Sequence, residues 1–349
     1  MANARERRAA RKPRGALHAL GWAVAAALIV RGAAAEAQAG PPVRRIYELR
    51  PVVDIPGQRG TGDVHAAGQG AHATSEAPGF RHAIGATRLA TGEILVAEDE
   101  PGRVLMYDST GRLWRVVGAR GTLPGEFRHI LWVSACGRDS AYVWDFMEAR
   151  MSVVSREGKI SRAHGVATDD TLRRDINTVA CHGPRFAFHA LPTTFPKPDA
   201  GVLRGMSTTW IVADENAPRV HVSDVKAEEL VTVGYGALPR PLGKRTSLAL
   251  SLDRLFIGTA DSLAVDVYDL TGRRLATWSA ASPAPRLTED AYGNAITELL
   301  RSLHSPDLRK QVRSVLERQP QPAQPAAYVR LHRNGDSLLW VELQPDVMA

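Results

Sequence analysis

The sequence predicts an all-β protein assembled from small antiparallel sheets that repeat along the chain. Between Gly92 and Phe127, three β-rich runs alternate with Gly- and Asp-rich turns, which is the pattern of a meander. The same unit recurs with 19 residues from its start to its turn glycine, at Gly92–Gly111, Asp139–Gly158 and Asp253–Gly272. A meander this small cannot bury its faces alone, so the copies must pack on one another. Four-stranded units at a pitch of 45–47 residues are typical of a β-propeller.

We expect six blades, with five as the alternative, in a propeller domain that spans residues 40–349. The blades that the pattern defines best begin at Phe80, at Phe127, near Asp175 and at Thr246. Positions 184 and 253, which match in the repeat, are 69 residues apart. Two alternatives explain that surplus: one blade with a long insertion, or two blades of which one is abbreviated and includes a weaker copy starting at Thr208.

Residues 286–319 break the β pattern and predict a helical hairpin near residues 287–318. Ser305 is a good N-cap and is followed by Pro306 at the first helical position. The apolar residues at helical spacing form one face in each helix: Ile296, Leu299, Leu300 and Leu303, then Leu308, Val312, Val315 and Leu316. We expect these faces to pack on the propeller, and the alternative is a role in partner binding.

The last blade is expected to be incomplete. Asp336 aligns with Asp139, so the matching turn glycine would fall beyond Ala349. A β-rich run at Ile46–Ile55 is the candidate that completes this blade, because closure of a propeller removes free sheet edges. A truncated gene product is the alternative.

Residues 1–39 have the pattern of a secretory signal peptide. A basic region ends at Arg14, an apolar run of 15 residues spans Ala16–Val30, and Ala37-Gln38-Ala39 fits an A-x-A cleavage site. The run is shorter than the ~20 residues that a spanning helix needs, and an uncleaved anchor is the alternative. We therefore expect a periplasmic or secreted protein with no membrane span in the mature chain.

Charge gives little support for nucleic-acid binding. The formal net charge is +7, but seven basic and two acidic residues fall within residues 1–39, so residues 40–349 carry only +2. The high isoelectric point is therefore largely a property of the N-terminal segment, and we expect no nucleic-acid partner.

Two cysteines, Cys136 and Cys181, lie one repeat apart at matching turns of adjacent blades. An oxidising compartment permits a disulfide between them, but matching positions on neighbouring blades can be too far apart for one. The sequence leaves a bridge and two separate thiols as alternatives.

The stretch of residues 102–127, GRVLMYDSTGRLWRVVGARGTLPGEF, resembles bacterial six-bladed propellers of the NHL-repeat and TolB-like group. In that group a strand, an Asp-x-x-Gly turn, a second strand and a G-x-G-x-G-x-F link recur; here the link has two extra residues. The resemblance covers residues 80–280, and 326–343 weakly. It implies a fold shared by binding modules, lactonase-like hydrolases and lyases, whose enzymes hold a metal on channel-facing Glu, Asn, Asp or His side chains. No such ligands map onto this chain residue by residue.

No catalytic motif stands out. The sequence has no G-x-S-x-G, H-E-x-x-H or P-loop, and Asp108 and Asp269 precede repeated tight turns, where Asp bonds its own backbone. We therefore assign no catalytic residues, no metal ligands and no cofactor. The predicted function is an exported module that binds a ligand or a protein, or serves as a scaffold. The alternative is a propeller hydrolase or lyase with a divalent metal in its channel.

Basic residues at the starts of blades form the candidate binding site. The first two blades begin identically, with Phe-Arg-His, and later blades begin with further cations. If the blades align, these side chains converge at one mouth of the channel and focus positive potential for an anionic ligand or an acidic partner. The candidates are Arg81, His82, Arg128, His129, Arg174 and Arg245. The alternative is that each is an ordinary charged residue, solvated separately.

Deletion of residues 46–55 tests the predicted closure of the last blade. Loss of a strand that pairs in that blade removes ladder hydrogen bonds and exposes apolar surface, so the melting temperature should fall markedly and the transition should broaden. Thermal unfolding followed by circular dichroism measures both. An unchanged melting curve would count against closure by this segment.

Overall fold

The computed structural model describes residues 80–343 apart from 81, 166–175, 191–200, 213–219, 235, 282–286, 304 and 335–337. By its contacts the chain divides into two compact units, Met1–Glu36 and Ala37–Ala349, and the described residues all belong to the second. The predicted signal peptide and the predicted closing strand at 46–55 lie outside the described residues.

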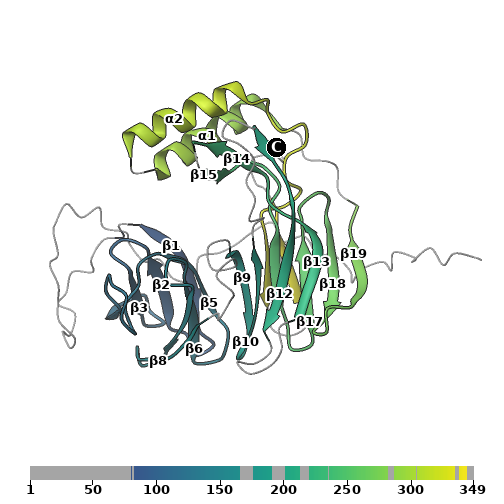
Figure 1. Ribbon diagram of the computed structural model, residues 1–349. Helices are drawn as coiled ribbons and strands as arrows, with labels where there is room; N and C mark the ends of the chain where they lie inside the picture. The colour runs from purple at the N-terminus through teal and green to yellow at the C-terminus, as the bar shows by residue number, and fades with distance from the viewer. Residues whose placement is uncertain are drawn as a thin grey trace, which may run out of the picture. The chain divides into compact units, whose positions relative to one another are not determined.

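The first two sheets are antiparallel, four-stranded and consecutive in sequence (Figure 1). The first consists of β1 (Ala83–Arg88), β2 (Ile94–Glu98), β3 (Arg103–Tyr107) and β4 (Leu113–Val117). The second consists of β5 (Ile130–Ala135), β6 (Ser140–Asp145), β7 (Arg150–Ser155) and β8 (Ile160–Gly165). Each is the meander that the repeat predicts, with strands in the order in which they occur along the chain.

The third sheet explains the 69-residue surplus. It contains β9 (Ile176–His182), β10 (Arg185–Ala190), β12 (Met206–Val212) and β13 (Val220–Lys226). The fourth contains β16 (Ser247–Leu250), β17 (Arg254–Gly258), β18 (Ala264–Asp269) and β19 (Arg274–Ser279), and a two-stranded sheet of β20 (Arg330–Asn334) and β21 (Leu338–Glu342) follows. The interpretation of one blade with an insertion is thus confirmed. The weak copy at Thr208 supplies the third and fourth strands of the third sheet and is not a blade of its own.

Apolar side chains join each sheet to the next. The first strands of successive sheets contact one another in the order β1, β5, β9, β16 and β20. Between the sheets lie four hydrophobic clusters, represented by Leu95 with Val133, Trp144 with Phe188, Ala187 with Leu250, and Phe256 with Tyr328. Meanders that stack through their faces and adjoin through their first strands are propeller blades, so the predicted all-β propeller is confirmed. The number of blades stays a prediction.

A small α/β layer is built from the segments inserted between blade strands. It comprises β11 (Val202–Leu203), β14 (Leu230–Val233) and β15 (Gly236–Pro239), covered by α1 (Glu289–Ser302) and α2 (Pro306–Arg318) (Figure 1). The hydroxyls of Thr288 and Ser305 cap the helices and accept bonds from Ala291 N and Leu308 N at 3.1 and 3.3 Å.

The predicted helical hairpin is therefore present, but the expectation that it packs on the propeller blades is wrong. Its buried residues Leu300, Val312 and Leu316 form one core with Val231 and Val233 of β14. The inserted sheet, which the sequence pattern did not reveal, offers the apolar surface that the helices need. The helices cover this sheet because its buried strand β14 would otherwise expose valines to water.

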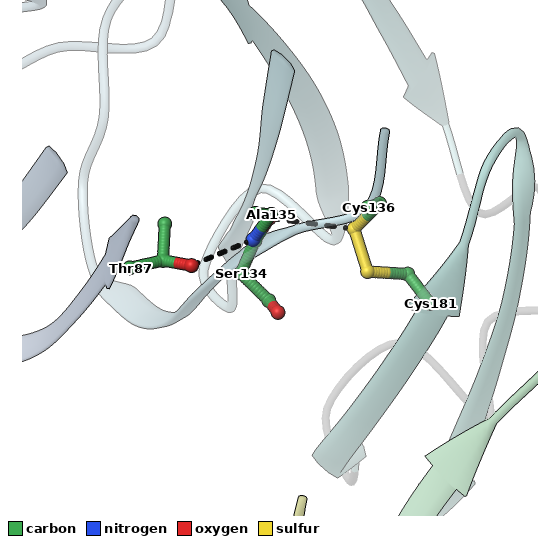
Figure 2. The surroundings of a disulfide bond; sticks show 5 residues. All are labelled: Thr87, Ser134, Ala135, Cys136 and Cys181. Atoms are coloured by element: carbon green, nitrogen blue, oxygen red, sulfur yellow. Dashed lines mark hydrogen bonds between the residues drawn. A yellow bond between two sulfur atoms is a disulfide. The ribbon is translucent and has the colours of Figure 1, made fainter. Parts of the chain in front are cut away.

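A disulfide joins the second and third sheets. Cys136 follows β5 and Cys181 lies in β9; their Cα atoms are 5.3 Å apart, within the usual range for a disulfide (Figure 2). Gly183 N also donates to Cys136 O. On the other side of β5, Ala135 N donates to the Thr87 hydroxyl of β1 at 2.8 Å (Figure 2). The structure therefore selects the bridge over two separate thiols, and one segment ties three sheets together.

The double substitution Cys136→Ala, Cys181→Ala tests the contribution of the disulfide to stability. The bond closes a loop with a sequence separation of 45 residues. Its loss should lower the free energy of unfolding by about 4 kcal/mol in the chain-entropy model. Chemical denaturation of the variant and of the oxidised and reduced wild type measures this. Equal midpoints for oxidised and reduced wild type would contradict the prediction.

A buried histidine should make stability depend on pH. His189 of β10 is fully buried, its Nδ1 lies 2.9 Å from the Thr209 hydroxyl, and burial lowers its pKa to about 4. The unfolded chain therefore binds this proton near pH 6.5 while the folded chain does not. Stability should fall as pH falls from about 6.5 to about 4, by at most about 1.4 kcal/mol per pH unit.

The variant His189→Asn should flatten the pH dependence of the unfolding free energy in this window. Because His332 is half exposed beside Glu342, the variant His332→Gln should leave that dependence in place and serves as the control. Urea unfolding at several pH values measures it. The same slope in His189→Asn as in the wild type would contradict the assignment.

Candidate functional site

The first two blades present the same backbone connection at the start of their first strands. Asp99 N donates to His82 O at 3.1 Å, and Phe146 N donates to His129 O at 2.8 Å. In both cases the residue that follows the second strand is bonded to the histidine that precedes the first strand. The repeat therefore places His82 and His129 at the same end of their sheets.

Asp99 brings the two histidines together. Its Oδ2 lies 2.8 Å from Nδ1 of His129 and 3.9 Å from Nδ1 of His82, and its Oδ1 accepts from Ile130 N at 2.9 Å. The residue is only 8% exposed, whereas both histidine side chains are more than one-third exposed. One buried carboxylate thus orients two accessible imidazoles from neighbouring sheets. We call Asp99, His82 and His129 the His–Asp cluster.

The charges in this cluster stabilise each other. Burial acts to raise the pKa of Asp99, but the hydrogen bond and positive charge of His129 outweigh it and hold that pKa below its usual range. The hydrogen bond to Asp99 raises the pKa of His129, against partial burial and the nearby charge of Arg120, which lower it. His129 therefore stays protonated to higher pH than an isolated histidine.

The link between the first and second blades positions Arg120 beside the cluster. Gly118 has a φ of +85°, and a Cβ there would lie 2.6 Å from the Phe127 ring. At Gly102 a Cβ would lie 2.6 Å from Phe127 O and 3.4 Å from Arg120 Cα. These glycines let the link pack tightly against the turn that follows Asp99. The exposed Arg120 was not among the predicted site residues, although the glycine pattern around it was visible.

Arg128 lies next to His129 and has a carboxylate partner. Its Nη1 is 3.3 Å from Glu148 Oε1, and its backbone N donates to Asp145 at 2.8 Å. Asp145 is fully buried and also accepts from the backbone N of His129, Met147 and Glu148. Asp145 therefore shapes the turn, whereas the half-exposed guanidinium of Arg128 remains at the surface of the site.

The other predicted site residues do not join this group in the structure. Arg81 and Arg174 lie outside the described residues. Arg245 is exposed beside Lys244, whose Nζ lies 3.7 Å from Asp261 and 4.0 Å from Glu229. The structure thus groups His82, Arg128 and His129 and gives them nearby carboxylates; convergence of all six residues on one channel mouth stays a prediction.

The turn aspartates have the structural role predicted for them. Asp108 accepts from the backbone N of Thr110 and Arg112 at 2.9 and 3.0 Å, and Asp269 accepts in the same way from Thr271 and Arg273. Within the described ranges, no group of three or more His, Cys, Asp or Glu is placed to hold a metal ion. Neither helix in that part of the chain is long and apolar enough to cross a membrane.

Comparisons with known proteins give no family. No family model matches the chain, and no curated protein matches it. Among solved structures, a nidogen/laminin complex is 9% identical over 57% of this chain and 80% of the other, with a TM-score of 0.31.

Two further structures are similar at the same low level. The Cps50 (Swd1) β-propeller domain of Myceliophteria thermophila is 14% identical, over 60% of this chain and 62% of that one, with a TM-score of 0.35. The dihydro-heme d1 dehydrogenase NirN is 13% identical, over 59% and 39%, with a TM-score of 0.34. The chain thus spans less than two thirds of these two relatives. Similarity this low adds nothing to what the sheets themselves establish, and the NHL-repeat resemblance stays a prediction.

Proposed function

We propose that this chain is an exported β-propeller that acts as a binding module, and that the His–Asp cluster with Arg120 and Arg128 receives an anionic group. That group belongs to a small ligand or to a protein partner. The signal-peptide pattern and the disulfide support a periplasmic or secreted location, because disulfides persist in oxidising compartments.

One observation carries the proposal: both histidines turn Nδ1 towards Asp99. An imidazole held at Nδ1 has its Nε2 left for another partner, and a protonated imidazole donates from both nitrogens. The cations Arg120 and Arg128 lie beside these donors, and a guanidinium suits a carboxylate or phosphate because its N–H groups form a planar fork. A fixed group of donors around one buried carboxylate is suited to binding an anion.

The structure offers no comparable observation for the alternative, a hydrolase or lyase that uses a channel metal. The described cluster combines two imidazoles and two guanidiniums with carboxylates that already accept hydrogen bonds from protein donors. Such a set recognises negative charge, and we assign it no catalytic step.

Anion titration of His129→Gln and Arg120→Gln tests the proposal. Each variant loses one charged donor, and loss of a charge-assisted hydrogen bond worth about 1.5 kcal/mol weakens binding roughly tenfold. Isothermal titration with inorganic phosphate and with succinate at low salt measures the change. Arg254→Gln is the matched control, since Arg254 begins β17, at the opposite end from the turn that follows a blade's second strand, and pairs with Asp253.

The same titration should depend on pH in a defined direction. Because the pKa of His129 is raised, wild-type affinity should be high below about pH 6.5 and fall as pH rises through the raised pKa. This dependence should be weaker in His129→Gln. Equal affinity of wild type, His129→Gln and Arg120→Gln for both anions would overturn the proposal.

A further inference from the structure

Two large apolar side chains are exposed in the segments that flank the His–Asp cluster. Leu123 is 63% exposed and Met147 is 53% exposed. Leu123 belongs to the same link as Arg120, and Met147 lies in the turn between β6 and β7, between Phe146 and Glu148. Single exposed apolar residues are ordinary on protein surfaces. Here, however, both accompany cationic groups in the same short segments.

The link and the turn are fastened to each other. Arg150, the first residue of β7, donates through Nη1 to Thr122 O at 3.0 Å and through Nη2 to Glu126 O. The Phe146 ring packs edge-on against His129, with centroids 5.9 Å apart. Leu123 and Met147 are therefore carried by elements whose positions relative to the cluster are fixed by hydrogen bonds and ring packing.

Charge on this surface is unbalanced in favour of cations. His82, His129, Arg120 and Arg128 face two carboxylates, Asp99 and Glu148. Asp99 is buried and accepts bonds from protein groups, so it does not repel a ligand as an exposed carboxylate would. An occupant that complements the surface carries negative charge for the cations and an apolar side chain for Leu123 and Met147.

We propose that this surface docks an acidic segment of another protein, anchored by an apolar side chain that packs on Leu123 and Met147. The inference rests on the proposed function, because the acidic residues of the segment occupy the same anion site. Inorganic anions make no use of the exposed apolar pair, whereas a peptide buries it. Methionine suits such a contact because its flexible, polarisable side chain adapts to different partners.

The expected contribution of the apolar pair is measurable. Burial of apolar surface stabilises by about 25 cal/mol per Å², so partial burial of two such side chains corresponds to roughly a tenfold gain in affinity. The pair should therefore separate peptides that differ in one apolar residue but carry the same charge.

Fluorescence anisotropy with two labelled peptides tests the inference on the full mature chain. One peptide carries several Glu residues and one Phe, and the other has Ser in place of Phe. The wild type should bind the first roughly tenfold more tightly. The double variant Leu123→Ser, Met147→Ser should erase that difference and leave phosphate binding unchanged. Leu252→Ser is the matched control, because Leu252 is 58% exposed in the turn between β16 and β17.

The outcomes separate this inference from the proposed function. If the two peptides bind equally while His129→Gln weakens both, the anion site stands and the apolar docking surface is excluded. If phosphate binds but neither peptide does, the site takes small anions and the docking proposal is again overturned. If neither phosphate nor peptide binds, both proposals fail.

Discussion

The fold depends on one constraint: the middle strands of the blades are apolar on both faces. β2, β6 and β17 each contain at least four consecutive buried residues, where a strand with one wet face would alternate. A sheet of this kind has to be covered on both sides, and the nearest available cover is the next copy of itself. The inter-sheet clusters, from Leu95 with Val133 to Phe256 with Tyr328, are the result. The same requirement makes a partner necessary for every face at the ends of the series.

The sequence predicted what repeats and missed what does not. Spacing between turn glycines identified the meanders of the first, second and fourth sheets, since Gly111 and Gly272 occupy left-handed positions that the turn requires. The inserted sheet was missed because β11 has only two residues and its partners β14 and β15 lie in a different interruption of the blade pattern. The disulfide was left open for a related reason: the separation of Cys136 and Cys181 depends on how closely adjacent blades approach, and a repeat length carries no information on that distance.

The candidate site arises where two nearly identical copies differ. Both begin with the same three residue types, so the sequence identified His82, Arg128 and His129 but treated the copies as equivalent. One pitch apart, Glu98 pairs with Arg103 at 2.6 Å, whereas the shorter Asp145 accepts backbone N–H groups. At the next position the first blade has Asp99 and the second has Phe146. One carboxylate consequently serves both histidines, and the aromatic ring packs against His129. Which copy keeps the carboxylate is visible in the sequence, but its contact with the neighbouring blade is a property of packing.

This asymmetry also determines what the site presents to solvent at each pH. With Nδ1 of His129 directed at Asp99, the neutral imidazole keeps its proton on Nδ1 and leaves Nε2 as an acceptor, which repels an anion. Protonation adds a donor at Nε2 and a positive charge in one step. Asp99 raises the pKa at which this occurs, while Arg120 lowers it. The affinity of an anion then adds to the effect of Asp99, because the ligand binds the protonated form better and so raises the pKa further. A buried carboxylate that no ligand touches thus controls whether the surface above it attracts or repels negative charge.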